Sequence, residues 1–184
     1  MGVTKSPGKL PIINKEDTLD NRLEKEFVEK LEKNQYIIHN ICRAYTQNRD
    51  DYKDLFQEIS IQLWKTYGKF RGEAKFSTWV YRVALNTAIS LYRKKKKYPK
   101  TENLDERVSA TPDTEYDDTR DRQLKELYQA IHKLNDIEKA LVLLYLEDKP
   151  YKEIAECLGI SEVNARVKMT RTKIKLKKLL NLEP

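Results

Sequence analysis

The segment from residue 76 to residue 97 constrains the fold of this chain more than any other. Its apolar side chains recur at the spacing of one face of an α-helix; they are Phe76, Trp79, Val80, Val83, Thr87 and Leu91. Ser77 is placed to cap this helix, and Phe76 is placed to pack on Tyr81 as a hydrophobic staple. We therefore expect a long amphipathic helix here.

The opposite face of this expected helix is polar and basic. It carries, at steps of four, four and three, Arg82, Asn86, Ser90 and Arg93. No acidic residue occurs between Phe76 and Lys97, and the segment ends in four consecutive lysines. Basic groups can neutralise phosphates while Asn, Ser and aromatic groups reach bases. The other interpretation is a solvated helix whose lysines serve only solubility.

Composition favours an all-α fold of one or two small domains. The 184 residues include only 5 Gly and 6 Pro, and helix-forming residues dominate without long runs of alternating β-branched residues. The net charge of +7 and the isoelectric point near 9.2 favour a polyanionic partner, either nucleic acid or an anionic membrane surface.

The chain divides by composition into four parts. Residues 1–20 lack periodicity and are predicted to be a flexible arm. Residues 21–98 form a first helical domain, in which a helix over residues 21–46 has a possible break near Asn34. Residues 99–121 form an acidic linker, since residues 101–121 carry eight acidic and two basic side chains. Residues 122–184 form a second helical domain.

A helix over the segment that follows Asp50 and Asp51 has two different faces. Asp50 and Asp51 are placed to cap it, and Leu55, Ile59 and Leu63 form its buried stripe. The outward positions are Asp54, Gln57, Glu58, Ile61, Gln62 and Lys65. The outward Ile61 indicates that a partner covers this surface.

The C-terminal domain carries a helix-turn-helix pattern. One helix spans residues 151–158, a turn follows at Gly159 and Ile160, and a second helix runs from Ser161 to about Leu180. Gly159 stands where a left-handed residue is needed, and Ser161 caps the second helix. Ile154, Ala155 and Leu158 are expected to face inward, and Ile160, Ala165, Val167 and Met169 are expected to supply apolar contacts. The residues available to DNA are Ser161, Glu162, Asn164, Arg166, Lys168, Arg171 and Lys173. The alternative is a helical hairpin for protein contacts.

Neither an enzyme nor a metalloprotein is indicated. The chain has two histidines, no Gly-rich phosphate loop and no set of nucleophile and base, so we expect no catalytic activity, no metal and no cofactor. His39 and Cys42 lack a second pair of ligands. Cys42 and Cys157 fall at apolar helical positions and are expected to be reduced. No signal peptide and no 18-residue apolar run is present, which predicts a cytoplasmic protein without membrane insertion.

Several short motifs together resemble those of one family. They are Asp54-Leu55-Phe56-Gln57-Glu58 with Trp64-Lys65, Lys69-Phe70-Arg71, the run from Phe76 to Ala84 with Asn86, Tyr151-Lys152-Glu153-Ile154-Ala155, and Leu158-Gly159-Ile160-Ser161. In this order and at these separations they resemble the sigma-70 superfamily of bacterial RNA polymerase sigma factors, and specifically the extracytoplasmic-function (ECF) type.

The resemblance implies roles for matching positions. The outward face of residues 54–65 is similar to the surface that docks on core RNA polymerase. The −10 promoter element is then held and opened by Lys69, Phe70, Arg71, Lys75, Phe76, Ser77, Trp79, Arg82, Asn86, Ser90 and Arg93. The helix from Ser161 resembles the reader of the −35 element in promoter DNA. An anti-sigma protein is an expected partner, and the linker is expected to thread through the polymerase.

The recognition helix departs from many relatives. It opens with Ser161-Glu162-Val163-Asn164-Ala165-Arg166, where many relatives have Gly-Thr-Val-Lys-Ser-Arg, so the resemblance predicts no particular −35 sequence. The competing hypothesis is a stand-alone helix-turn-helix regulator that does not bind polymerase. The aromatic loop and helix favour the sigma factor, because a simple repressor needs no strand-opening element.

Overall fold

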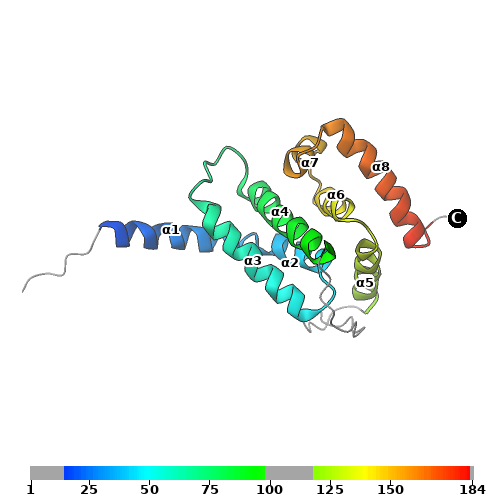
Figure 1. The fold of residues 1–184 in the computed structure, drawn as a ribbon, viewed down its shortest axis with the longest axis horizontal. Helices are drawn as coiled ribbons and strands as arrows, with labels where there is room; N and C mark the ends of the chain where they lie inside the picture. Colours follow the sequence, from blue (N-terminus) through cyan, green and yellow to red (C-terminus); the bar gives the residue numbers. More distant parts are fainter. Residues whose placement is uncertain (1–14, 98–117, 183–184) are drawn as a thin grey trace, which may run out of the picture. The chain divides into compact units, whose positions relative to one another are not determined.

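The computed structural model describes residues 15–97 and 118–182, and in these ranges it contains eight α-helices and no strand (Figure 1). The helices are α1 (Lys15–Glu32), α2 (Gln35–Tyr45), α3 (Arg49–Tyr67), α4 (Phe76–Lys97), α5 (Asp118–His132), α6 (Asp136–Leu146), α7 (Tyr151–Leu158) and α8 (Glu162–Leu179). The all-α prediction is confirmed.

The predicted boundaries of the N-terminal arm and of the acidic linker differ from the observed ends of the helices. The first helix begins at Lys15, within the predicted arm, and it ends at Glu32, close to the break expected near Asn34. α5 begins at Asp118, within the predicted linker. The rest of the predicted arm and most of the linker lie outside the described residues. The chain forms two compact units, residues 1–33 and residues 34–184, and the second holds α2 to α8.

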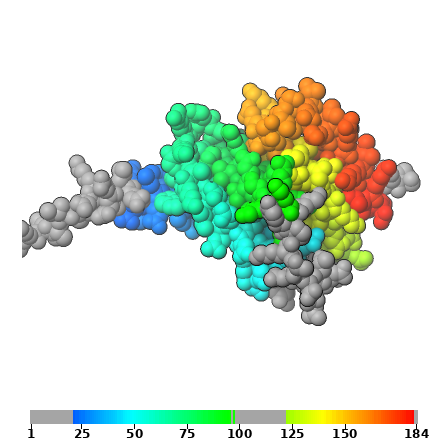
Figure 2. Space-filling view, viewed as in Figure 1, coloured from blue at the N-terminus to red at the C-terminus, as the bar shows by residue number. Residues whose placement is uncertain are grey.

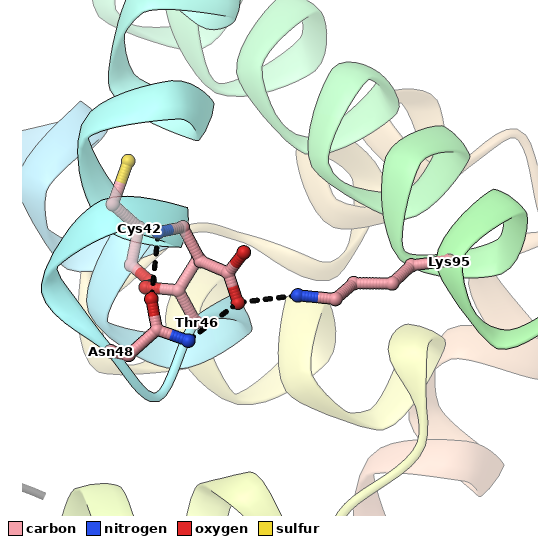
Figure 3. Close-up of polar contacts among 5 residues, drawn as sticks. Cys42, Thr46, Asn48 and Lys95 are labelled. Carbon is pink, nitrogen blue, oxygen red and sulfur yellow. Dashed lines mark hydrogen bonds and ion pairs between the residues drawn. The ribbon is translucent and has the colours of Figure 1, made fainter. Parts of the chain in front are cut away.

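Helices α2, α3 and α4 pack on one another in the second unit. The stripe predicted for α3 is confirmed, since Leu55, Ile59 and Leu63 are all buried. The predicted cap is wrong: Asn48 caps α3 by accepting a hydrogen bond from the Asp51 backbone N–H at 2.8 Å. The Asp51 carboxylate instead accepts a hydrogen bond from the Lys95 ammonium of α4. This contact connects the end of α4 to the start of α3 (Figure 3).

α4 buries a different face from the one its large apolar residues predicted. The buried side chains are Thr78, Val80, Tyr81, Ala84, Leu85, Ala88 and Ile89, whereas Leu91 is exposed. α4 has α2 and α3 on one side and α6 and α7 on the other, so its buried arc is wide. Ala84 and Ala88 lie within that arc, where small side chains permit close approach of helices.

α6 is the central helix of the C-terminal group. Six consecutive residues, Lys139 to Leu144, are buried, because α6 packs against α2, α4, α5, α7 and α8. Its N-cap is Asn135, and Asn135 and Glu138 form a reciprocal capping box with two hydrogen bonds of 2.9 Å. A helix buried all round is typical of a domain centre.

The two predicted helical groups contact each other within the second unit. α4 contacts α6 and α7, and α2 contacts α5 and α6, so the surfaces of α4 and α6 meet (Figure 2). Polar groups connect them: Arg93 pairs with the Asp136 carboxylate, the Tyr45 hydroxyl donates to the Asp136 carbonyl, and the Thr78 hydroxyl donates to Glu153 at 3.0 Å.

A buried cation lies in this interface. Lys139 is only 2% exposed, and its Nζ lies 4.8 Å from the ring centroid of Tyr92 and 5.4 Å from that of Tyr45. Burial lowers the pKa of Lys139 to about 8, while the nearby Asp136 raises it. The charge is therefore held by two aromatic faces and costs desolvation energy.

Replacing Lys139 by Met should stabilise the protein at pH 7. The buried ammonium is exchanged for an apolar side chain of similar length, and such exchanges are often neutral or stabilising by about 1–4 kcal/mol. Because the native pKa lies below that of the unfolded chain, the unfolded state binds more protons, and wild-type stability rises with pH above about 8.

Urea unfolding from pH 7 to pH 9.5 tests this prediction. The difference in free energy of unfolding between the variant and the wild type should narrow as pH rises. A Lys139→Met protein that is less stable at pH 7 would show that the aromatic contacts outweigh desolvation.

Candidate nucleic-acid interface

The outer face of α3 carries the six residues predicted to bind polymerase. None of them is buried, and Ile61 is 38% exposed. Glu58 accepts a hydrogen bond from the Gln62 amide at 2.8 Å, one turn along the same face. Trp64, which is 42% exposed, extends this face with a large apolar group. The surface thus combines carboxylates with an exposed aliphatic and an exposed aromatic side chain.

The loop from residue 68 to residue 75 joins α3 to α4. Backbone N–H groups of Lys69 and Phe70 donate to the carbonyls of Thr66 and Tyr67, at 3.0 and 2.9 Å, which turns the chain back after α3. Gly72 has a φ of +74°, a conformation that favours glycine. Lys69, Arg71 and Lys75 are exposed, so the loop presents its cations to solvent.

An aromatic cluster anchors this loop on α4. The ring of Trp79 lies 5.2 Å from that of Phe70 and 5.3 Å from that of Phe76, and Tyr67 borders all three. Phe76 therefore packs within this cluster, where a staple with Tyr81 was expected. The helix begins at Phe76, so Ser77 lies in the first turn, and the N–H of Trp79 bonds to the carbonyl of Lys75. The predicted cap at Ser77 is wrong.

A pocket of about 340 Å³ lies where this loop meets α4 and α7. Aromatic side chains of Phe70 and Trp79 line it together with the cations of Lys69, Arg71 and Arg82. Glu73, Ala74 and Thr78 of the loop and α4 also line it, although they were not among the predicted site residues. Glu156 and Cys157 of α7 line it as well, and sequence reasoning missed them because α7 is distant in the chain. The Cys157 thiol lies 3.9 Å from the Thr78 carbonyl, and burial raises its pKa to about 11.

The polar line of α4 is exposed, as predicted. Arg82, Asn86, Ser90 and Arg93 all face solvent on the side opposite Ala84 and Ala88. Arg93 already pairs with Asp136 of α6, and Lys95 with Asp51. Arg82, at the other end of this line, is exposed and can meet a polyanion.

The helix-turn-helix has the predicted turn geometry. Gly159 has a φ of +64° and ends α7, and the Ser161 hydroxyl caps α8 by accepting from the Asn164 N–H at 3.2 Å. Ile154, Ala155, Ala165 and Met169 are buried, which seats α8 against its neighbours. Val167 is 45% exposed, so its predicted apolar contact is wrong.

None of the seven residues predicted to meet duplex DNA is buried. Six of them are exposed and Lys173 is half-buried, with its Nζ 3.7 Å from the Tyr145 ring centroid. Arg166 donates to the Glu162 carboxylate at 2.6 Å and lies 4.5 Å from the centroid of the Tyr151 ring. The Glu162 carboxylate thus orients Arg166. The sequence had predicted that Glu162 itself would be available to DNA.

The remaining expectations concern cysteines, metals and membranes. Cys42 and Cys157 are both free and buried, and burial raises the pKa of Cys42 to about 12. In residues 15–97 and 118–182 no three His, Cys, Asp or Glu side chains cluster to hold a metal ion. Within the same ranges, no helix has both the length and the apolar character to cross a membrane.

Comparison with known proteins identifies the class to which this fold and site belong. Residues 31–98 match sigma-70 region 2, and residues 124–176 match sigma-70 region 4. The chain is 31% identical over 148 residues to RNA polymerase sigma factor YlaC of Bacillus subtilis, covering 78% of this chain and 85% of that protein. The chain belongs to the sigma-70 family of RNA polymerase sigma factors.

Further relatives define the type. The ECF RNA polymerase sigma-E factor of Haemophilus influenzae is 29% identical over 147 residues, covering 71% of this chain and 76% of the relative. Two solved structures share the fold at 17% identity. The sigma factor RpoE, in complex with the anti-sigma factor NepR from Bartonella quintana, has a TM-score of 0.70 and covers 87% of this chain and 99% of its own.

The second structure, CnrH in complex with the cytosolic domain of CnrY, has a TM-score of 0.62 and covers 88% of this chain and 91% of its own. The protein is an RNA polymerase sigma factor of the ECF type, acting in transcription initiation as a DNA-binding protein and not as an enzyme. This excludes the alternative of a stand-alone regulator.

Gly159→Ala should destabilise the helix-turn-helix by about 1–2 kcal/mol, because a Cβ disfavours the left-handed conformation. Nothing lies within 4 Å of the added Cβ, so the effect is on the backbone alone. Gly68→Ala is the matched control, since Gly68 has an ordinary φ of −60° and equally open surroundings. Urea unfolding compares them, and equal effects at the two positions would contradict the requirement for a left-handed residue.

Proposed function

We propose that three exposed surfaces of this sigma factor divide its work. The outer face of α3 binds core RNA polymerase, the loop of residues 68–75 with α4 binds and opens the −10 element, and α8 reads the −35 element. The observation that carries this proposal is the aromatic pocket with a basic rim beside a helix-turn-helix. A reader of duplex DNA alone has no use for such a pocket, whereas strand opening requires one.

The pocket suits an unpaired base. Phe70 and Trp79 offer aromatic surface for stacking, which is worth about 1–3 kcal/mol per base. Lys69 and Arg71 lie at its rim, where they can bind the phosphates that flank an extruded base. A single strand that leaves the pocket along α4 then meets Arg82, Asn86 and Ser90 in order.

DNA binding at this site exchanges intramolecular partners for nucleic acid. Glu156 of α7 lines the pocket, and the hydroxyl of Thr78 donates to Glu153 of the same helix. Arg93 pairs with Asp136. Carboxylates thus occupy positions near those proposed for phosphates, and α7 and α6 must move from α4 before a strand can use all of this surface.

The outer face of α3 has the chemistry of a protein contact. It joins the carboxylates of Asp54 and Glu58 to the exposed Ile61, so an apolar contact can be surrounded by charges that orient the partner. We propose a complementary basic surface on core polymerase. The acidic linker then threads through the polymerase, in a channel otherwise used by nucleic acid.

Two further elements complete the proposal. An anti-sigma protein sequesters this factor, as expected from the solved relatives, which are complexes with NepR and CnrY. The site of action is the cytoplasm, where a bacterial RNA polymerase works on its DNA.

Charge reversal on α3 tests the polymerase surface. Asp54→Lys and Glu58→Lys should each weaken binding to core polymerase about tenfold or more, because like charges then face each other. Co-elution with core enzyme in size-exclusion chromatography measures this. Glu126→Lys is the matched control, since it makes the same charge change at an exposed position on α5. Loss of binding in the control, or retention in both α3 variants, would contradict the assignment.

Substitutions on α4 and α8 should separate opening from duplex recognition. Lys168→Ala and Arg166→Ala should weaken −35 binding by about 1–3 kcal/mol if a base contact is lost. Asn86→Ala should leave duplex binding unchanged and reduce opening, and its exposed position makes a folding defect unexpected. Permanganate reactivity of unpaired thymines reports opening, and a footprint that responds alike to both sets would contradict the division.

A further inference from the structure

An unexplained apolar stripe runs along the exposed side of α8. Val163 is 72% exposed, Val167 is 45% exposed and Ile174 is 49% exposed. Their spacing of four and seven residues puts all three on one face of the helix. The buried residues Ala165, Met169 and Thr172 lie on another face, so the stripe takes no part in the core.

The stripe has basic neighbours. Arg166 precedes Val167, and Arg171 follows Thr170. Thr170 lies in the stripe between Val167 and Ile174. Arg166, Thr170 and Arg171 are all exposed. The Thr170 hydroxyl donates to the Arg166 carbonyl at 3.0 Å, so its polar group is already used within the helix. A ligand that covers this face therefore meets an apolar group bordered by two guanidinium groups, of which that of Arg166 pairs with Glu162.

Duplex DNA offers this combination in its major groove. The thymine C5-methyl group is the apolar feature of that groove, and phosphates border the groove on both sides. The first turns of the second helix are the part of a helix-turn-helix that reaches base edges. Val163 and Val167 lie in those turns, with only Ser161 and Glu162 before them.

The positions along α8 separate Val163 and Val167 from Ile174. At a rise of about 1.5 Å per residue, Val167 lies about 6 Å along the helix from Val163, whereas Ile174 lies about 16 Å away. Because the N-terminal residues of a recognition helix are those that contact base edges, the first two side chains are placed to meet bases and Ile174 is not. Ile174 is thus an exposed aliphatic residue on the same face that serves as an internal control.

We propose that Val163 and Val167 are specificity-determining residues that read thymine in the −35 element by packing on its C5-methyl group. This inference rests on the proposed role of α8 as the −35 reader. It adds an apolar contact to the polar ones assigned to Arg166, Lys168 and Arg171.

The test uses holoenzyme and a −35 element selected from random duplexes that share a fixed −10 element. Each selected thymine is then replaced by deoxyuridine, which removes only the C5-methyl group. Wild-type holoenzyme should lose about fourfold in affinity at each contacted thymine, as for one buried methyl group. Val163→Ala and Val167→Ala should each abolish the deoxyuridine effect at one thymine, and Ile174→Ala should leave every effect in place.

These variants should fold, because alanine has the higher helix propensity and the replaced side chains are exposed. Arg171→Ala tests the proposed role of α8 separately from the valine inference, because this variant should weaken binding to thymine and deoxyuridine duplexes alike. If Arg171→Ala has no effect and no −35 element is selected, the proposed role of α8 fails.

A selected element that tolerates deoxyuridine everywhere, or that lacks thymine, overturns the valine inference while leaving that role intact. Variants that keep the wild-type deoxyuridine penalties but lose binding to an anti-sigma protein overturn it as well, and they assign the stripe to a protein partner.

Discussion

The burial of α6 is the packing constraint on which the rest of the second unit depends. Residues Lys139 to Leu144 are enclosed by helices from both sequence-matched regions, so region 2 and region 4 share one interior. Ala140, Leu141 and Leu144 have almost no exposed surface. Helices as short as α6 and α7 depend on such burial, because isolated helices of this length are marginal in water.

The interface between the two regions differs chemically from the interior of each. It includes an Arg–Asp pair, a Thr–Glu hydrogen bond and a lysine held between two tyrosines. The Arg93 side chain of the ion pair is 62% exposed, and ion pairs exposed to this extent contribute little net stability. The proposed binding of DNA along α4 requires these polar contacts to be exchanged for contacts with nucleic acid.

The functional surfaces follow from a division between buried and exposed positions. α3 buries Leu55, Ile59 and Leu63 and leaves its acidic face outward, whereas α8 buries only a narrow stripe and exposes cations and valines together. A helix with a narrow buried face is held in place by few residues and offers most of its surface to a ligand. One short C-terminal group therefore exposes both Arg171 and Val167, which we propose meet the same groove.

The sequence by itself determined the local features of this protein. The stripe of α3, the exposed polar line of α4, the left-handed Gly159 and the cap at Ser161 all follow from short-range rules of periodicity and capping, and the motifs that resemble sigma factors are likewise contiguous. Tertiary structure decided which side of α4 is buried, because helices on both of its sides select Ala84 and Ala88 over larger apolar residues. It also decided that Glu156 and Cys157 border the pocket and that Lys139 lies between Tyr45 and Tyr92. Those contacts join residues separated by tens of positions, and no local pattern encodes which distant surface a helix will meet.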